Sequence, residues 1–352
     1  MTSPARYSAS SLVRFATELL TRAGLDESMA ADVGAILVDG DLLGHTTHGL
    51  QLLGPYLREI EAGTMLRSGA PDVISSHTVA QMWDGKRLPG PALVLRALDA
   101  AATMARAHGT GTITIRRSHH IACLAAYLKR ATDRNLMLIL SCSDPAVASV
   151  APFGAVTPVF TPNPIAAGFP TSGDPVLLDI SASLTTNGLT GRLFQEGRRL
   201  PHPWIQDHLG NATDDPAVLF NEPKGTLLPT GGLDAGHKGY GLALLIEALT
   251  AGLSGHGRAD PREGWGATVF VQVIDPEAFG GIAQFTRQTD WLATACRAAT
   301  PRPGGENVRL PGERGLAMFH RQQREGVEVY PGILAGLEPL AVRYGVAPPA
   351  AL

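Results

Sequence analysis

Residues 39–49 read Asp39-Gly40-Asp41-Leu42-Leu43-Gly44-His45-Thr46-Thr47-His48-Gly49, and they place acid, hydroxyl and imidazole groups at the glycine-punctuated end of an apolar helix pattern. Histidine is the side chain best suited to moving a proton near neutral pH, and a neighbouring hydroxyl can orient or relay that proton. Two surface histidines at a helix end are the plainer interpretation, because the helix dipole favours histidine there. We expect the chemistry of the chain in this stretch.

Helical periodicity surrounds the stretch on both sides. Apolar residues recur at helical spacing over 12–24, over 26–43 and again over 50–62, with glycines closing the first and third segments. The first 65 residues therefore predict an all-helical unit.

The pattern changes after Pro71. A β-prone run at 79–83 precedes a long helix from Pro91 to His108 that Gly109 closes. Further strands are predicted at 112–116, 136–140, 175–180 and 268–274. The segment 239–254 is apolar nearly all round, which predicts a buried helix. Strands and helices do not strictly alternate, so the predicted class is α+β and not a doubly wound sheet.

The totals exclude several kinds of partner. A formal charge of −3 and 17 % charged residues leave no basic block for nucleic acid. No run of 18 uncharged apolar residues and no signal-peptide pattern occurs, so we expect a soluble, unexported protein. Cys123, Cys142 and Cys296 lie far apart without a CxxC pair, which fits a reducing cytoplasm. Small molecules are the expected partners.

Common catalytic and nucleotide motifs are absent from the sequence. It contains neither G-x-G-x-x-G nor G-x-x-x-x-G-K-[ST], and neither HExxH nor G-x-S-x-G. The pairs His45/His48 and His119/His120 are possible zinc ligands. Because no carboxylate or cysteine stands at ligand spacing beside either pair, we predict no metal.

Six motifs nevertheless share their order and spacing with one family over about residues 10 to 320. They are His48-Gly49, Ser118-His119-His120, Asn163-Pro164-Ile165-Ala166, Asp179-Ile180-Ser181-Ala182-Ser183, Gly236-His237-Lys238-Gly239-Tyr240-Gly241-Leu242 and Pro311-Gly312-Glu313. The chain resembles the malate/L-lactate/sulfolactate dehydrogenase family. That group also holds the diketogulonate, ureidoglycolate and cyclic-imine carboxylate oxidoreductases and is distinct from the Rossmann-type dehydrogenases.

The resemblance implies a domain plan and a quaternary state. It implies a helical domain of residues 1–70 joined by the C-terminal segment 275–352, and a β-rich domain of residues 71–274. The β-rich domain would bind NAD or NADP without a Rossmann fingerprint. Family members are usually homodimers with active sites near the subunit interface, so a homodimer is expected.

The resemblance also implies the catalytic roles. The family's proton donor is the histidine of a Ser-His-Gly motif, and His48 stands at that position. Thr47 replaces the serine and keeps the hydroxyl, although its β-methyl group narrows the available rotamers. Hydride from the nicotinamide C4 would reach a carbonyl or imine carbon while His48 protonates the oxygen or nitrogen. No role remains for His45.

Cofactor contacts are implied at four places in the chain. Free backbone N–H groups at a helix start favour phosphate, and a lysine adds to that preference. The implied cofactor-binding residues are His120, Ile121, Ala122, Cys123, Leu124, Asp179, Ile180, Ser181, His237, Lys238, Arg309, Pro311, Gly312, Glu313 and Arg314. The segment from Arg309 to Gly315 would close over the cofactor as a loop. The choice between NAD and NADP is not legible from the sequence.

The implied substrate residues depart from the family pattern. Leu52 stands where the family commonly has an arginine that grips the substrate carboxylate. Asn187-Gly188-Leu189 replaces an Arg-Gly-Lys or His-Gly-Asp segment, so a charge is lost at Leu189 as well. A leucine cannot anchor a carboxylate. We therefore expect a larger or more apolar substrate, or one without the usual carboxylate, such as a cyclic imine or ketone.

Three alternatives stay open at the level of sequence. Arg58, Arg117 or Arg192 is available to supply the missing cation from a new direction. A catalytically degenerate member would bind nucleotide as a structural or regulatory module, which Leu52 and Leu189 favour. The retained pair Thr47-His48 favours an active NAD(P)H-dependent oxidoreductase instead. A metal-dependent hydrolase or lyase built on the four histidines is the third reading.

Overall fold

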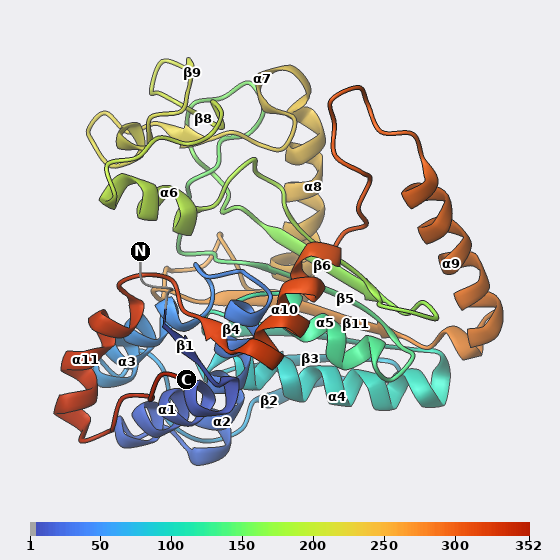
Figure 1. The fold of residues 1–352 in the computed structure, drawn as a ribbon, viewed down its shortest axis with the longest axis horizontal. Coiled ribbons are helices and arrows are strands. Elements are labelled where there is room, and N and C mark those ends of the chain that lie inside the picture. The colour runs from blue at the N-terminus through green and yellow to red at the C-terminus, as the bar shows by residue number, and fades with distance from the viewer. Residues whose placement is uncertain (1–4) are drawn as a thin grey trace.

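The computed structural model describes residues 5–352 as helices packed beside and against one large sheet (Figure 1). The sheet has seven strands in the order β2-β3-β4-β11-β5-β6-β7, with only β3 and β4 parallel. Its strands are β2 (Asp72–Ser76), β3 (Ala80–Asp84), β4 (Thr110–Ser118), β5 (Met137–Ser143), β6 (Pro164–Phe169), β7 (Val176–Ser181) and β11 (Ala267–Ile274). The mixture of this sheet with unalternating helices confirms the α+β class.

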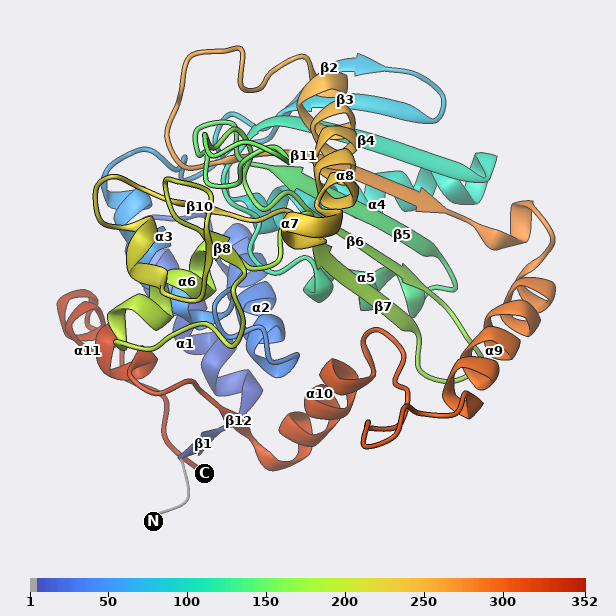
Figure 2. The ribbon, with the colours of Figure 1, turned by 90° about the horizontal axis from the view of Figure 1, so that it is seen from above.

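Helices cover both faces of the sheet. α4 (Gly90–His108) and α5 (Ala125–Thr132) pack on one face, and α8 (His237–Glu247) with the turn 248–252 lies on the other (Figure 2). Pro91 opens α4, and Gly109 ends it in the left-handed conformation at φ 88. The helix predicted from Pro91 to His108 is therefore confirmed.

The helical unit at the N-terminus is also as predicted. It consists of α1 (Ala9–Arg22), α2 (Glu27–Leu42), the short helix η1 (Leu50–Leu52) and α3 (Leu53–Glu61). Its buried residues belong to the same hydrophobic cluster as those of α4, β4 and β11. The helical unit and the large sheet thus share one continuous core.

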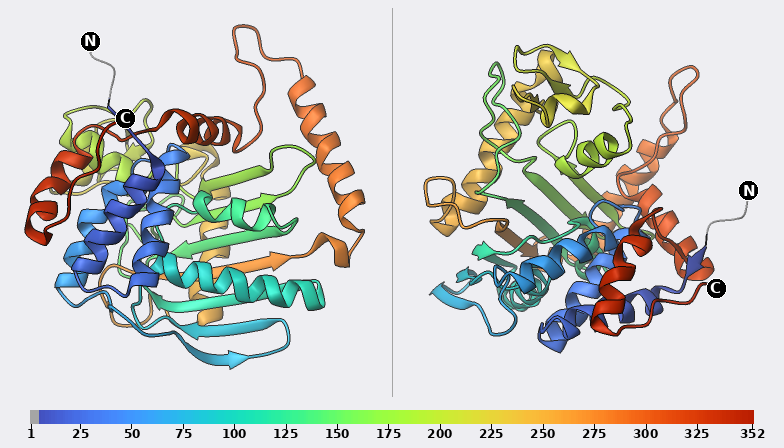
Figure 3. Two further views of the ribbon diagram at one scale, coloured as in Figure 1. Left: turned by 60° about the horizontal axis from the view of Figure 1, so that its bottom comes forward. Right: turned by 90° about the vertical axis from the view of Figure 1, so that its left-hand side faces the viewer.

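The C-terminal segment returns to the helical unit. α10 (Glu313–Glu325) packs against α2, and α11 (Ile333–Tyr344) packs against α1 and α3. β1 (Arg6–Tyr7) pairs with β12 (Val327–Glu328), which brings the two ends of the chain together (Figure 3). α9 (Ile282–Ala298) stands apart from this group, beside the large sheet (Figure 1).

A smaller unit stands on the α8 side of the sheet (Figures 1 and 2). It has its own cluster of buried residues, which includes Phe160, Ile205, Leu227 and Ile246. Its elements are α6 (Asn187–Gln195), β8 (Ile205–Gln206), β9 (Ala212–Thr213), η2 (Pro216–Leu219), β10 (Thr226–Leu227) and α7 (Gly232–Ala235), and η4 (Pro276–Ala278) follows β11.

One helix differs from its prediction. Leu244 and Leu245 of α8 expose 47 % and 52 % of their surface, so the expectation of a helix buried all round is wrong for this single chain. Only Gly239, Ala243 and Ile246 are buried, because the sheet covers a single side of the helix. The remaining apolar side of α8 is open.

Candidate active site

The turn that carries His48 is held from both sides. Gly44 follows the end of α2 and has a φ of 84. The backbone N–H of His48 donates to the carbonyl of His45 at 2.8 Å. The buried carboxylate of Asp41 accepts from the Leu50 N–H at 2.8 Å. A Cβ on Gly49 would lie 2.3 Å from Oδ1 of Asp41, so only glycine fits after His48. Asp41 therefore fixes the turn.

His48 has a defined hydrogen-bond partner. Oγ1 of Thr47 lies 2.9 Å from Nδ1 of His48. If Nδ1 carries the ring proton and donates it to the Thr47 hydroxyl, Nε2 keeps its lone pair and remains free to accept a proton from a substrate. Burial lowers the pKa of His48 to about 4, and the charges of His45 and Arg192 act in the same direction. The ring is therefore neutral at neutral pH.

The start of α6 lies directly beside this pair. A Cβ placed on Gly188 would lie 3.4 Å from Cβ of Thr47 and 3.7 Å from Cε1 of His48. Thr186 caps α6 by accepting from the Leu189 N–H. The structure thus brings the segment Asn187-Gly188-Leu189, predicted to face the substrate, next to the predicted proton donor.

His120 forms the opposite wall. Its ring stacks near His48 with centroids 5.9 Å apart, and Nδ1 of His120 lies 2.8 Å from the Tyr56 hydroxyl. The Trp265 ring is 4.6 Å from His120 on the other side. Burial lowers the pKa of His120 well below its ordinary value, and His48 and His119 add to this. Two neutral imidazoles therefore line the site.

The other segments predicted to bind cofactor meet around the end of β7. Asp179, Ile180 and Ser181 are its last three residues, and not residues that follow the strand. Oδ2 of Asp179 accepts from the Ala125 N–H at 2.9 Å, which joins β7 to the segment 120–124. The carbonyl of Ser181 accepts from Oγ1 of Thr230 at 3.0 Å.

Lys238 and His237 are exposed in the first turn of α8. A Cβ on Gly239 would lie 2.5 Å from the Ala182 carbonyl, so this turn packs tightly on the chain that leaves β7. The helix start therefore presents the Lys238 cation close to the end of β7, whereas the N–H of Gly239 is already donated to the Thr230 carbonyl at 3.0 Å.

The C-terminal segment reaches the same strand. The carbonyl of Pro311 accepts from the Leu177 N–H at 3.2 Å, and Gly312 has φ 89 with a Cβ position 2.7 Å from Cβ of Leu177. Arg309 and Arg314 are exposed at either side of this contact. Glu313 begins α10, so the predicted loop ends there and its last residues are helical.

The substrate side contains one arginine near His48. Leu52 is half-buried against the main core, as a leucine is expected to be. Nη1 of Arg192 donates to Oγ1 of Thr46 at 2.8 Å, Nη2 donates to Gln51, and the guanidinium lies 3.8 Å from the Tyr330 ring centroid. Burial lowers the pKa of Arg192. Arg192 is therefore a desolvated cation at the site.

The two other arginines considered from the sequence do not face this site. Arg58 is exposed on α3. Arg117 forms ion pairs with Asp84 and Glu263. Arg192 is the one of the three that contacts the His48 turn.

Some residues of the site gave little or no sequence signal. Tyr56 follows His48 by two helical turns on the way into α3, a spacing that identifies it in retrospect. Trp265 lies in an aperiodic loop between the turn 248–252 and β11, where no pattern points to it. Asp41 was visible in the opening stretch but was not assigned a role.

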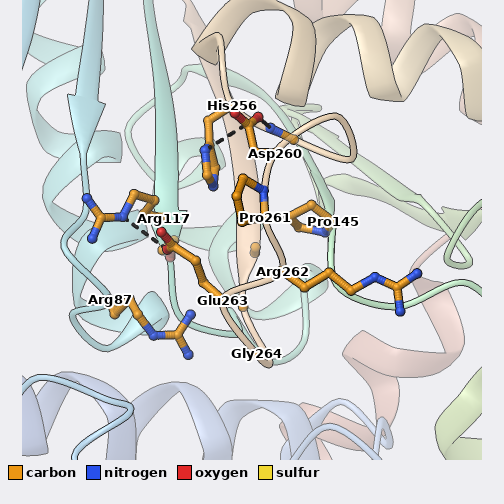
Figure 4. A pocket seen from close by; sticks show the side chains of 13 residues that line it. Arg87, Arg117, Pro145, His256, Asp260, Pro261, Arg262, Glu263 and Gly264 are labelled. Carbon is orange, nitrogen blue, oxygen red and sulfur yellow. Dashed lines mark hydrogen bonds and ion pairs between the residues drawn. The ribbon is translucent and has the colours of Figure 1, made fainter.

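A separate pocket borders the loop that carries Trp265, since Gly264 and Gly266 on either side of Trp265 in the sequence line it (Figure 4). It is lined mainly by Arg87, Arg117, Pro145, His256 and residues 260–264, and of these residues Arg117 is the one considered for the substrate cation from the sequence. Arg87 donates from Nε to the Thr64 carbonyl and from Nη2 to the Trp265 carbonyl. Arg87 therefore holds the backbone of Trp265 in place. The residues that line the pocket do not include His48.

Within residues 5–352, none of the helices combines the length and the apolar character that crossing a membrane requires.

Comparison with known proteins identifies the family. The family model described as malate/L-lactate dehydrogenase matches residues 7–338. Malate dehydrogenase from Pyrococcus horikoshii is 30 % identical over 344 residues, covering 95 % of this chain and 94 % of that protein.

Solved structures agree with this match. The structure of malate dehydrogenase from Pyrococcus horikoshii OT3 has a TM-score of 0.89 at 26 % identity and covers 99 % of this chain and 98 % of its own. The Δ1-piperideine-2-carboxylate reductase from Pseudomonas syringae pvar. tomato has a TM-score of 0.82 at 26 % identity, with coverage of 96 % and 99 %. The predicted resemblance is confirmed: the chain belongs to the malate/L-lactate dehydrogenase family and is an oxidoreductase.

Proposed function

We propose that the protein is an NAD(P)H-dependent oxidoreductase that reduces a carbonyl or imine carbon, or oxidises the corresponding alcohol or amine, with His48 moving the proton. The observation that carries the proposal is the hydrogen bond between Thr47 and Nδ1 of His48, which leaves Nε2 open beside Gly188 and His120. A catalytic imidazole needs one nitrogen held and the other free.

The residues around β7 fit an anionic dinucleotide. Lys238, exposed in the first turn of α8, offers positive charge to phosphate at the end of the strand. The backbone of His120 to Leu124 turns through a positive φ of 58 at Ala122, directly between β4 and α5. When bound there, a nicotinamide cofactor supplies or accepts the hydride. The sheet would hold it without a Rossmann arrangement.

His48 acts as a base in one direction and as an acid in the other. With a pKa near 4, the neutral ring is ready to accept a proton from a hydroxyl or amine. For reduction it must first be protonated. A substrate carboxylate on Arg192 would offset the cation that lowers the pKa of His48, so binding of an acid raises that pKa and prepares the ring.

Arg192 supports an acidic substrate class. Gly188 and Arg192 are one turn apart on α6 and share a face, so the guanidinium lies on the side of the helix that approaches His48. This placement compensates for Leu52. We therefore favour a 2-oxo acid or a cyclic imine carboxylate over the neutral ketone or imine that Leu52 alone suggested. The solved neighbour named for Δ1-piperideine-2-carboxylate is consistent with that class.

We also propose that the protein is a homodimer. α8 exposes Leu244 and Leu245, and Leu253 beyond it is 58 % exposed. A run of exposed leucines beside a proposed cofactor site suits a second subunit.

The test compares cofactor binding with turnover. Purified protein is titrated with NADH and NADPH by fluorescence and assayed on 2-oxo acids, cyclic imine carboxylates and matched neutral ketones and imines. His48→Asn is expected to lower kcat by about 100-fold or more while cofactor affinity stays within about twofold. Arg192→Gln is expected to raise KM for acids by about 10-fold or more and to spare neutral substrates. Arg198→Gln, an exposed arginine just after α6, is the control.

Each failure has a separate meaning. Cofactor binding without turnover on any substrate favours the regulatory module. Full turnover in His48→Asn removes His48 as the proton donor. Equal losses on acids and neutral substrates in Arg192→Gln assign that residue a structural role.

A further inference from the structure

Three metal-binding side chains converge beside the proposed active site from distant parts of the sequence. His45 comes from the turn after α2, Cys123 from the segment between β4 and α5, and Asp179 from β7. One nitrogen, one sulfur and one oxygen atom of these side chains all lie within 4.8 Å of one another. Cys123 is buried, and the other two side chains are half-buried.

The backbone holds all three residues in place. The His45 N–H donates to the Gly40 carbonyl at 2.8 Å, and a Cβ on Gly40 would lie 3.4 Å from Cβ of Cys123. Oδ2 of Asp179 is fixed by the Ala125 N–H, which leaves Oδ1 for another partner. α2, α5 and β7 therefore present the three side chains to one common point.

The His45 and Asp179 side chains lie close together, with ligand atoms within 4.8 Å of each other, but no hydrogen bond or ion pair joins them among the described residues. Burial raises the pKa of the Cys123 thiol well above its ordinary value, and the nearby Asp179 carboxylate acts in the same direction. A cation placed between the three groups would complete their contacts.

We propose that His45, Cys123 and Asp179 form a binding site for a divalent transition metal of the zinc type. Imidazole nitrogen, thiolate sulfur and carboxylate oxygen are zinc ligands, whereas Mg²⁺ and Ca²⁺ prefer oxygen alone. Ligand bonds of about 2.0–2.3 Å require the half-exposed His45 and Asp179 side chains to close in by up to about 1 Å. Three protein ligands leave the fourth position of a tetrahedral ion open.

The proposed site differs from the histidine pairs at which the sequence predicts no metal. That prediction looked for a cysteine or carboxylate near the histidines in sequence, and the fold supplies both from more than 70 residues away. Metal binding would tie the turn that carries His48 to β7. Cys123 and Asp179 also belong to the residues proposed for cofactor binding, so metal binding is measured without cofactor and substrate.

Cobalt(II) provides a direct test because a thiolate ligand gives an intense charge-transfer absorption in the near ultraviolet. Chelator-treated protein is titrated with Co²⁺ and then with Zn²⁺, without cofactor or substrate. We expect one equivalent of Co²⁺ to bind with a thiolate band and visible absorption of tetrahedral type, Zn²⁺ to displace it, and the melting temperature to rise.

Matched variants identify the ligands. Cys123→Ser is expected to abolish the thiolate band, while Cys296→Ser, at an exposed cysteine of α9, retains it. His45→Gln is expected to weaken Co²⁺ binding by about 10-fold or more, and circular dichroism checks that each variant is folded. A folded wild-type protein without the band, or a band that persists in Cys123→Ser, overturns the proposal. Loss of turnover with the band intact affects only the proposed function.

Discussion

At the scale of single residues, the proposed site is held by one contact between neighbours in the chain, Thr47 and His48, and one between distant residues, Thr46 and Arg192. His48 and Thr47 are neighbours in the chain, so their contact follows from the motif itself. From the sequence, Arg192 is one of three arginines considered to replace the cation lost at Leu52, and the choice among them depends on α6 lying next to the His48 turn. The sequence shows that the arginine expected at position 52 is a leucine. The fold supports the proposal that Arg192 takes over its role, since Arg192 contacts Thr46 in the His48 turn.

Asp41 gives a prediction about pH and stability. Burial raises the pKa of Asp41 from 3.8 to about 7, although the Leu50 N–H partly opposes this. Because the folded pKa exceeds the unfolded one, the stability that Asp41 contributes is full below about pH 3.8 and is lost as the pH rises through 7. Asn cannot ionise. Asp41→Asn should therefore gain about 2 kcal/mol relative to wild type between pH 5 and pH 8.

Urea unfolding at several pH values measures this difference. His48 and His119, whose pKa values burial lowers to about 4, titrate in both proteins and cancel in the comparison. A difference between wild type and Asp41→Asn that does not change from pH 5 to pH 8 would show that Asp41 is ionised throughout.

At the scale of elements, the sequence predicted helices best where the apolar side of the helix packs against other residues of the same chain. α2 and α4 have apolar stripes and end at glycines, and both were predicted within a few residues. α8 was misjudged because periodicity reports how apolar a helix is and not what covers it. The apolar side of α8 has no partner within the described chain, and no pattern in one sequence separates a core from an interface.

Gly90 packs the start of α4 tightly against the backbone of His119 and His120. A Cβ at this first residue of α4 would lie 2.4 Å from the carbonyl oxygens of both His119 and His120. Gly90→Ala must push this backbone away from α4. We expect it to lower stability by about 1–3 kcal/mol and to weaken NADH binding, because His120 moves with the backbone.

Gly336→Ala in α11 is the matched control. Its Cβ would meet nothing within 4 Å, so alanine there should raise stability by about 0.5–1 kcal/mol through helix propensity alone. Thermal unfolding and NADH fluorescence titration measure both variants. Equal stability and affinity in the two would mean that the close packing of α4 on His119 and His120 relaxes without consequence.

At the scale of the molecule, the proposed site is assembled from segments that the sequence keeps far apart. The carbonyl of Pro311 accepts a hydrogen bond from Leu177 of β7. Gln322 of α10 donates hydrogen bonds to the carbonyls of Asp41 and Leu42 at the end of α2. Cys123 lies close to His45 and Asp179. Family resemblance indicated most of the residues proposed for cofactor binding. It did not reveal Trp265 or the cluster at His45, since both depend on packing between segments distant in the sequence. The division into domains at residues 70 and 275 stays a prediction.

The exposed leucines of α8 lead to a prediction about the homodimer proposed for this protein. Burying a leucine stabilises a contact by about 1.5–3 kcal/mol, so an aspartate in the same place both removes that gain and adds a charge that must be desolvated. Leu245→Asp is expected to shift a wild-type dimer to monomer in sedimentation velocity at micromolar concentration. Leu209→Asp is the control, because Leu209 is 72 % exposed and lies in the loop between β8 and β9, outside α8. A wild-type protein that sediments as a monomer, or a Leu245→Asp variant that remains dimeric, would show that the exposed face of α8 is not the subunit interface.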